Sequence, residues 1–502
     1  MRYLRRLPLD LTFLLGILLR VQHLFHLDAA REPFRLGGLF VAFSREILNN
    51  GFRLPQTIPF YSAGGIPFAY PPLAFYVEAV LLALFPRREI LIANLLPPLM
   101  ACLTLAAVFL LLKQIFPNNR GALLAGFFAY AFLPNAFANQ IEAAGLAESF
   151  GSLALVIFFA AALRFRAAPG WQNSLGAGAA LALCMLASPG SAIGAAGLSV
   201  LLGAEQLLRQ RFAARALAQV ALIAVSGAAL SAPYWALVMK NHGRGIFLLP
   251  VLAQYEIGKQ PFLSVLLNNL TAFQVTQDGW AFAWNWLIFL GLLWLILRGK
   301  PALPLAFLLL FSIPRENVWL MALPAALLFA YGLTEALAAL IPPQAGRRAL
   351  SAALMLLAAW GVLQSFNLVR ALERDQQWKL SAAQVERLAE ARALLPENAQ
   401  ILILGNEALS EWAPYLLQRE VLNTQFGLEW QPNEMEAYIS LSARLAAARS
   451  WEDIYAAAPH NGPLYVLADD KKRLTALSRA SDFPFTLKLE TTELQLGLLG
   501  NP

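Results

Sequence analysis

Long apolar runs separated by short polar turns fill most of the chain up to about residue 370. Apolar stretches of roughly 18 or more residues are typical of membrane-spanning helices. Some of the runs are shorter and would need tilt or a thin stretch of bilayer. We expect about eleven spans, at residues 8–26, 90–112, 121–138, 146–165, 174–188, 190–208, 216–239, 279–297, 301–313, 318–340 and 349–367. The pattern therefore predicts a polytopic α-helical membrane protein.

The apolar run 73–85 has only about 13 residues, which favours an interfacial or re-entrant element over a span. The distribution of Lys and Arg decides between these alternatives, because cytoplasmic loops carry an excess of both. If 73–85 does not span and the N-terminus is cytoplasmic, nearly all the basic groups between spans face the cytoplasm. These groups are Lys113 and Arg120; Arg164 and Arg166; Arg209, Arg211 and Arg215; Arg298 and Lys300; and Arg347 and Arg348. If 73–85 spans, every one of these assignments inverts.

The favoured topology places three loops on the outer side, at residues 27–89, 139–145 and 240–278. The chain then divides into a transmembrane domain, 1–369, and an extracytoplasmic domain, 370–502. This second domain alternates strand-like runs such as QILILGN with helical runs such as SAAQVERLAEARALL, which predicts a small α/β domain. The expected location is the cytoplasmic (inner) membrane of a cell with an envelope.

Composition agrees with a membrane protein and narrows its partners. The chain is 58% hydrophobic and 14% charged, and a soluble domain rarely exceeds half apolar residues. The net charge of +7 comes from short basic groups between apolar runs rather than from one basic face, so we expect membrane lipids and no nucleic acid as partners. Cys102 and Cys184 lie inside apolar runs and are expected to be core residues. The basic, apolar N-terminus is interpreted as an uncleaved signal anchor, with a cleaved signal peptide as the alternative.

Three segments resemble the GT-C glycosyltransferases, polytopic enzymes that use polyprenyl-phosphate sugars. FSREILNNG, residues 43–51, followed by a Pro-rich stretch and YPPLAFYVEA, is similar to the first external loop of lipid A aminoarabinose transferases, protein O-mannosyltransferases and a bacterial branch of GT-C-like membrane proteins. EAAGLAESFGSLAL and FSIPRENVWLMALPAALLFAYGL match later family segments. The resemblance implies transfer of a sugar from a polyprenyl-phosphate donor to an unknown acceptor at the outer face of the membrane, with inversion at the anomeric carbon.

One position departs from the family pattern. Relatives carry an acid about fifteen residues before the glycine that matches Gly51, and here those positions are Leu36 and Gly37. The nearest acids are Asp28 and Glu32. This departure supports an alternative function, a non-catalytic lipid-binding or scaffold protein in an envelope assembly. A transporter is disfavoured, because no paired repeats or mid-membrane charges are apparent.

Four acids are candidates for the base that takes a proton from the acceptor, because burial near the interface raises the pKa of a carboxyl group toward working pH. Asp28 and Glu32 have the i, i+4 spacing that would place them on one face of a helix, and a solvated juxtamembrane turn is the alternative. Glu148 begins a span beside an outer loop, where its alternative role is to interact with the helix dipole. Glu142 lies six residues earlier.

Arginine suits the leaving phosphate, since its guanidinium matches phosphate oxygens. The candidates are Arg315 in the IPREN turn, Arg244 in NHGRGIF, and Arg87 and Arg88 in PRRE, with ion pairing or headgroup anchoring as the alternative. A substrate platform is expected at Tyr70, Pro71, Pro72 and Tyr76, where prolines prevent an earlier helix from continuing and aromatic rings suit the headgroup level. A plain aromatic belt is the alternative there. No metal site is assigned, and the need for a divalent cation stays open.

Overall fold

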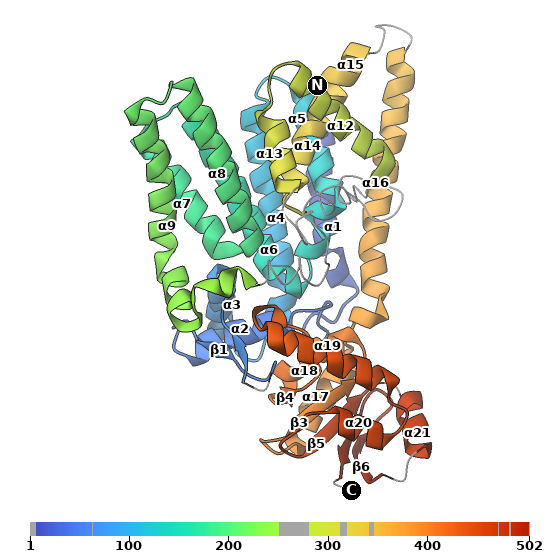
Figure 1. The fold of residues 1–502 in the computed structure, drawn as a ribbon. Coiled ribbons are helices and arrows are strands. Elements are labelled where there is room, and N and C mark those ends of the chain that lie inside the picture. Colours follow the sequence, from blue (N-terminus) through green and yellow to red (C-terminus); the bar gives the residue numbers. More distant parts are fainter. Residues whose placement is uncertain are drawn as a thin grey trace.

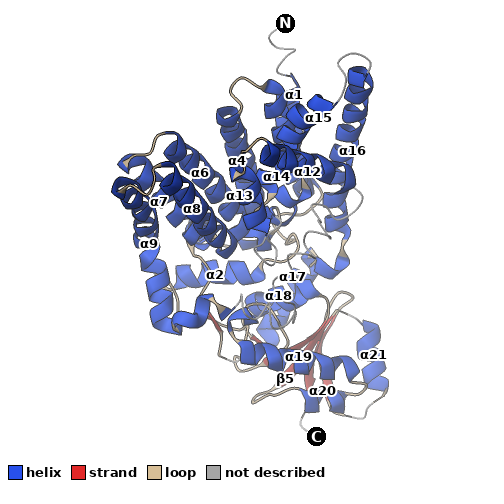
Figure 2. Ribbon diagram, turned by 45° about the horizontal axis from the view of Figure 1, so that its top comes forward, coloured by secondary structure: helices blue, strands red, loops and turns tan. Residues whose placement is uncertain are grey.

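The structure is a computed structural model that describes residues 7–62, 64–249, 281–311, 319–340, 346–469, 471–480 and 483–500. For 7, 281–284, 311, 346–354 and 471–473 it describes the backbone alone. Figures 1 and 2 show a bundle of long helices joined to a smaller domain that contains the main sheet.

Each predicted span falls on one or more helices of the bundle. The helices are α1 (Leu7–Val21), α4 (Glu89–Ile115), α5 (Arg120–Phe132), α6 (Leu146–Ala167), α7 (Trp171–Ala187), α8 (Pro189–Arg209), α9 (Ala214–His242), α12 (Ala281–Leu297), α13 (Ala302–Phe311), α14 (Ala322–Tyr331), α15 (Leu337–Leu340) and α16 (Gly346–Arg374). Within the described residues, seven helical stretches are long and apolar enough to cross a membrane, or eight if the bent pair Arg120–Phe132 and Pro134–Gln140 counts as one span. The predicted class, a polytopic helical membrane protein, is confirmed, and the count of eleven spans stays a prediction.

Short helical turns connect or extend several of these elements. They are η1 (Gln22–Phe25), η2 (Pro134–Ala136), η3 (Ala138–Gln140), η4 (Ala143–Gly145), η5 (Arg244–Phe247), the π-helical η7 (Gly332–Ala336), η8 (Gln376–Trp378) and η9 (Leu428–Trp430). The second outer loop of the prediction thus consists largely of tight turns that lead directly into α6.

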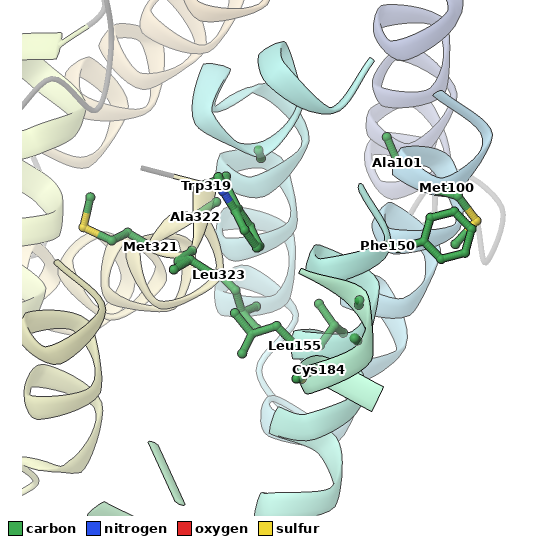
Figure 3. Close-up of a cluster of buried hydrophobic side chains, with 14 of the residues drawn as sticks. Met100, Ala101, Phe150, Leu155, Cys184, Trp319, Met321, Ala322 and Leu323 are labelled. Atoms are coloured by element: carbon green, nitrogen blue, oxygen red, sulfur yellow. The ribbon is translucent and has the colours of Figure 1, made fainter. Parts of the chain in front are cut away.

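The bundle is held together by apolar side chains from helices that are distant in sequence. Figure 3 shows part of this core, where Phe150 of α6 lies beside Met100 of α4 and Leu155 of α6 lies near Cys184 of α7. At one contact in the core, the backbones of two helices approach so closely that no side chain fits between them. A Cβ atom on Gly291 of α12 would clash with the backbone of Leu328 and Gly332, so glycine lets these helices come into direct contact. Cys102 and Cys184 are both free thiols; Cys102 is half-buried and Cys184 is buried.

The first outer loop contains two helices and a short hairpin. These are α2 (Gly38–Asn49), β1 (Thr57–Ile58), β2 (Ile66–Pro67) and α3 (Leu73–Leu84), with Thr57 paired to Pro67 in the antiparallel hairpin. Pro72 is the residue before the first turn of α3. At about 1.5 Å per residue, the 12 residues of α3 extend about 18 Å, which is too short to cross the roughly 30 Å hydrocarbon core.

The C-terminal α/β domain has a five-stranded mixed sheet. Its elements are α17 (Ala382–Leu394), β3 (Gln400–Leu404), α18 (Glu407–Leu417), β4 (Glu420–Val421), α19 (Pro432–Ala447), α20 (Trp451–Ala457), β5 (Leu464–Ala468), α21 (Lys471–Arg479), β6 (Phe485–Glu490) and β7 (Gln495–Leu499). The strand order is β4-β3-β5-β7-β6, with β4, β3 and β5 parallel and β7 antiparallel to both of its neighbours. The predicted small α/β domain is therefore present. The boundary predicted at 369/370 falls inside α16 and stays a prediction.

The sheet packs against helices on both faces, and one face also contacts the first outer loop. One buried cluster joins α17, α18 and the sheet to Val41 of α2, Ala93 of α4 and Ala143 of η4. The other contains Leu441, Trp451 and Leu477, from α19, α20 and α21. The domain is thus docked directly on the loop segments at one end of the bundle.

The loop and the domain lie at the same end of the bundle. In Figure 1, α2, α3 and β1 sit between the bundle and the C-terminal domain, whereas the turn between α8 and α9 lies at the opposite end. That turn carries Arg209, Arg211 and Arg215. This basic turn and the first outer loop therefore lie at opposite ends of the bundle, as predicted. The orientation of the bundle in a membrane stays a prediction.

Candidate functional site

The loop residues just before α2 bind the second outer loop. The guanidinium Nε of Arg35 lies 2.6 Å from Oε2 of Glu142, and their side chains are 15% and 18% exposed. The backbone N–H of Ala144 donates to the carbonyl oxygen of Leu36 at 2.8 Å. Glu142, one of the predicted acids, therefore lies next to Leu36 and Gly37, the positions where the resemblance implies an acid.

A carboxylate from the C-terminal domain reaches the same place. The N–H groups of Gly37 and Gly38 donate to Oε2 of Glu411 at 2.9 and 2.7 Å, and the N–H of Leu39 donates to Oε1 at 2.8 Å. Glu411 belongs to α18 and is 2% exposed. The first N–H groups of a helix have no partner within the helix, and α2 has no side-chain cap of its own. Glu411 thus supplies the missing acceptor.

Neighbouring residues hold Glu411 in this position. The indole N–H of Trp412 donates to the carbonyl oxygen of Arg35 at 2.9 Å, and the hydroxyl of Tyr61 donates to the carbonyl oxygen of Glu411 at 3.0 Å. A Cβ atom on Gly38 would lie 2.8 Å from Cα of Trp412, so the two backbones can meet only because residue 38 is a glycine. Helix α18 and the start of α2 therefore form one packed unit.

A second buried acid, Glu78, lies on the other side of α2. The hydroxyl of Ser44 donates to Oε2 of Glu78 at 2.5 Å, and Glu78 is 1% exposed. Burial raises the pKa of Glu78 to about 7, and the hydrogen bond from Ser44 opposes this shift. Arg45, the next residue of α2, forms an ion pair with Glu89 and a hydrogen bond with Tyr415.

Burial also raises the pKa of Glu411 to about 7, and the nearby charge of Glu142 adds a small contribution in the same direction. The hydrogen bonds from the N–H groups of Gly37, Leu39 and Gly38 act in the opposite direction, because they favour the charged form. Sequence reasoning did not select Glu411 or Glu78. Glu78 lies in an apolar run and Glu411 is far from the loop in sequence, so no local pattern marks them.

The remaining predicted acids lie on two other segments of the chain. Asp28 and Glu32 lie on a turn, not on a regular helix; Asp28 is exposed and its carboxylate lies 3.9 Å from Nε of Arg31. Oε1 of Glu32 accepts a long hydrogen bond, 3.5 Å, from the N–H of Ala382 at the start of α17. Glu148 is half-buried in the first turn of α6. Of the four acids, the described contacts bring only Glu142 to the start of α2.

The other end of α2 borders a large cavity. Its volume is about 1210 Å³, and it lies between the first outer loop and the helices α7 and α9. The first outer loop contributes polar side chains with both signs of charge, and the helices α7 and α9 contribute leucines, a proline, Tyr234, Lys240 and Asn241. The lining residues are Glu46, Asn49, Asn50, Arg53, Leu54, Pro55, Gln56, Thr57, Pro72, Leu73, Tyr76, Leu186, Leu230, Pro233, Tyr234, Leu237, Lys240 and Asn241.

Two of the predicted platform residues, Pro72 and Tyr76, line this cavity. Pro71 is buried beside them. Tyr70 instead belongs to an aromatic cluster, in which its ring centre lies 5.7 Å from that of Trp430 in the C-terminal domain. The hydroxyl of Tyr234 on α9 donates to the carbonyl oxygen of Ala69 at 2.7 Å, which fixes the platform against the bundle.

The predicted phosphate-binding arginines do not meet in this cavity. Arg244, Arg87 and Arg88 are exposed and are not among the residues of its described lining. Arg315 lies outside the described residues. Two cations that sequence reasoning did not select, Arg53 and Lys240, line the cavity instead. The sequence feature that could have pointed to Arg53 is its position after Gly51, in the loop that connects α2 to β1.

Across the described part of the chain, no three His, Cys, Asp or Glu side chains lie close enough together to hold a metal ion. The acids at the start of α2 are instead engaged by a guanidinium and by backbone N–H groups. The need for a divalent cation is not decided by this arrangement.

The helical bundle, the structured first outer loop and the docked α/β domain together define a polytopic membrane protein, with a candidate site at the first outer loop. No protein-family model and no curated protein sequence matches the chain. Solved structures do match its fold. ArnT from Cupriavidus metallidurans bound to undecaprenyl phosphate aligns with a TM-score of 0.59 at 14% identity, over 98% of this chain and 99% of that chain.

Two further structures extend this likeness. The Archaeoglobus fulgidus oligosaccharyltransferase in complex with Zn and sulfate has a TM-score of 0.58 at 16% identity, over 98% of this chain and 73% of that chain. The arabinofuranosyltransferase AftD from Mycobacteria has a TM-score of 0.56 at 14% identity, over 99% of this chain and 42% of that chain. The chain therefore has the fold of the GT-C glycosyltransferases, as the sequence resemblance predicted.

Proposed function

We propose that this protein is a GT-C-type glycosyltransferase, which moves a sugar from a polyprenyl-phosphate donor to an acceptor at the outer face of the cytoplasmic membrane. The observation that carries the proposal is the amphipathic cavity beside the Pro-rich platform, in a chain that has the same fold as ArnT bound to undecaprenyl phosphate. The sugar and the acceptor are not specified by these features.

The lining of the cavity suits a lipid with a phosphate headgroup. Leu230 and Leu237 of α9 are exposed on the bundle surface and offer an apolar wall to a polyprenyl chain. Arg53 and Lys240 lie in the polar part of the lining, where each can donate charged hydrogen bonds to phosphate oxygens. A polyprenyl phosphate needs both surfaces, because its headgroup remains at the interface while its tail stays in hydrocarbon.

The transfer step needs a base and a stabilised leaving group. The acceptor attacks the anomeric carbon as the bond from that carbon to the phosphate oxygen breaks, and the lipid phosphate leaves with the electron pair. The acceptor proton goes to a carboxylate, for which we propose Glu148, since it lies half-buried at the start of α6. Asp28, Glu32 and Glu142 remain alternatives, with Glu142 held by Arg35.

Arg315, Arg244, Arg87 and Arg88 are proposed as further contacts to donor phosphate or headgroups, in addition to Arg53 and Lys240 in the cavity. Tyr70, Pro71, Pro72 and Tyr76 are proposed as the platform. Of these, Pro72 and Tyr76 have direct access to the cavity.

We also propose that the N-terminus is cytoplasmic and that the C-terminal domain is extracytoplasmic, because the basic turn between α8 and α9 lies opposite that domain. In a variant with both native cysteines replaced, Gln56→Cys and Glu434→Cys should react with a membrane-impermeant thiol reagent in intact cells. Arg215→Cys should react only after lysis. The reverse pattern would contradict this orientation.

The transfer proposal is tested by turnover of purified protein in nanodiscs. Polyprenyl-phosphate monosaccharides are supplied as a panel with a membrane extract as the acceptor source, and the release of polyprenyl phosphate is measured. Glu148→Gln should lower release about 10²-fold or more while thermal stability is kept. Tight binding of the lipid without release from any member of the panel would contradict transfer and favour a non-catalytic lipid-binding protein.

A further inference from the structure

The start of α2 lacks the groups that usually complete a helix N-terminus. Its capping residue is Gly37, with no side-chain acceptor, and the first turn contains no acid. Ser, Thr, Asp and Asn are the residues that normally accept hydrogen bonds there. A Cβ atom on Gly37 would clash with Ala143, so the loop cannot carry any of these side chains at this position without displacing η4. The acceptor must come from another part of the chain.

Glu411 meets this need with both of its oxygens. Oε2 accepts two N–H groups and Oε1 accepts a third, so one side chain binds three consecutive residues, the capping residue Gly37 and the first two residues of α2. The carboxylate is 2% exposed, which excludes an incidental surface contact. A buried acid is costly to place unless its hydrogen bonds are satisfied, and here it is placed directly on the N-terminus of a helix, where the dipole favours negative charge.

The two residues directly before this segment are bound by the second outer loop. Arg35 pairs with Glu142, and the carbonyl oxygen of Leu36 accepts the N–H of Ala144. The segment therefore lies between α18 of the C-terminal domain and the turn that leads into α6, where Glu148 sits. A shift of α18 would be transmitted through α2 to this turn.

We propose that Glu411 is a positioning residue, through which the C-terminal domain replaces the acid absent from positions 36 and 37 and sets the place of α2 beside the second outer loop. Trp412 and Tyr61 complete this contact, defined here as the α18 clamp. The clamp makes the C-terminal domain part of the outer site rather than an appended module. Its binding role stands on the described contacts alone, whereas its effect on sugar transfer rests on the proposed function.

The test uses the full-length protein in nanodiscs and four substitutions on one helix. Glu411→Gln removes the charge and one of the two acceptor oxygens, and Glu411→Asp keeps the charge on a shorter side chain. Glu407→Gln on the first turn of α18 is the matched control, because Glu407 contacts Gln425 and not α2. Trp412→Phe tests the clamp independently, since it keeps an aromatic ring but loses the indole N–H that donates to the carbonyl oxygen of Arg35.

Amide hydrogen exchange of a peptide that covers residues 36–43 is the first readout. Loss of a helix cap predicts roughly tenfold faster exchange in Glu411→Gln, partial recovery in Glu411→Asp, and no change in Glu407→Gln. Peptides from α9 should keep their wild-type rates in all variants. Wild-type exchange at residues 36–43 in both Glu411→Gln and Trp412→Phe would overturn the clamp.

Release of polyprenyl phosphate is the second readout. Glu411→Gln should lower the maximal rate more than it raises the KM for the donor, and Glu411→Asp should restore part of the rate. A variant with fast exchange and full transfer would overturn the positioning role. If the wild-type protein releases no lipid phosphate, the proposed transfer is contradicted, and the clamp is judged by exchange alone.

Discussion

The two ends of helix α2 differ in what surrounds them. Its N-terminal end is enclosed by the second outer loop and by α18, and the N–H groups of its capping residue and of its first two residues all donate to one buried carboxylate. Its C-terminal end is open, with Asn49 and Asn50 exposed on the wall of a cavity of about 1210 Å³. The comparison shows how a single short helix can be fixed at one end and leave the other available for a ligand.

The difference arises from where the stabilising partners come from. The fixed end is held by groups distant in sequence, a carboxylate from α18 and the carboxylate of Glu142, which pairs with Arg35 just before α2. The open end is surrounded by its own loop and by the lipid-facing helix α9. Substitutions at the fixed end should therefore affect stability, and substitutions at the open end should affect binding.

The largest expected effect is at the fixed end. Glu411→Ala leaves three buried N–H groups without their acceptor, so the free energy of unfolding should fall by about 3 kcal/mol. Thermal unfolding in detergent measures this loss. Glu407→Ala on the same helix should change it by less than about 0.5 kcal/mol. Equal effects of the two substitutions would contradict the special place of Glu411.

At the open end, charge removal should change binding and not stability. Each charged hydrogen bond contributes roughly 1.5–3 kcal/mol, so Arg53→Ala with Lys240→Ala should weaken the binding of undecaprenyl phosphate at least about tenfold. Native mass spectrometry with titrated lipid measures this change. Arg209→Ala, at the opposite end of the bundle, is the control for nonspecific charge effects. Unchanged affinity in the double variant would assign the lipid headgroup to another place.

The ion pair between Arg35 and Glu142 should have a smaller effect on stability. Both side chains are mostly but not fully buried, so Glu142→Gln should lower the free energy of unfolding by about 1–2 kcal/mol. The double variant with Arg35→Met should lose less than the sum of the two single losses, because the two groups interact directly. If the stability loss of the double variant equals the sum of the two single losses, the ion pair does not connect the two loops.

The smallest expected effect is a pH dependence at the fixed end. Burial raises the pKa of Glu411 to about 7, above the usual value of 4.5, so its stabilising contribution is full below pH 4.5 and is lost as pH rises through 7. The free energy of unfolding should fall by about 1 kcal/mol for this group between pH 6 and 8. Glu78, whose pKa is also about 7, contributes with the same sign. Glu411→Gln should remove the part of this pH dependence that is due to Glu411 and keep the part due to Glu78. If the free energy of unfolding changes with pH in this variant as it does in the wild type, the pH dependence does not come from Glu411.

Hydrophobic pattern alone predicted much of the fold. Residues 73–85 were recognised as too short to span, and α3 at Leu73–Leu84 has this length. The strand-like run QILILGN predicted β3, because alternating or continuous apolar residues over a few positions are typical of a sheet core. These features depend on residues that are close in sequence.

The candidate site was predictable only in part. Glu142 was selected from its place in an outer loop, and Pro72 and Tyr76 from the chemistry of their segment. Glu411 was not, because it lies in an ordinary amphipathic helix about 370 residues from the loop that it binds. Glu78 was hidden for a different reason, since its only mark is a single charge inside an apolar run. Contacts between distant elements have no local pattern.

A hydrogen-exchange footprint of the wild-type protein tests the comparison between the two ends of α2 most directly. Exchange is measured in nanodiscs with and without undecaprenyl phosphate. We expect slow exchange at residues 36–41 in both conditions, because the α18 clamp is formed without ligand. We expect new protection at residues 49–57 only when the lipid is present. Lipid-dependent protection at 36–41 with none at 49–57 would contradict the proposed difference between the two ends of α2.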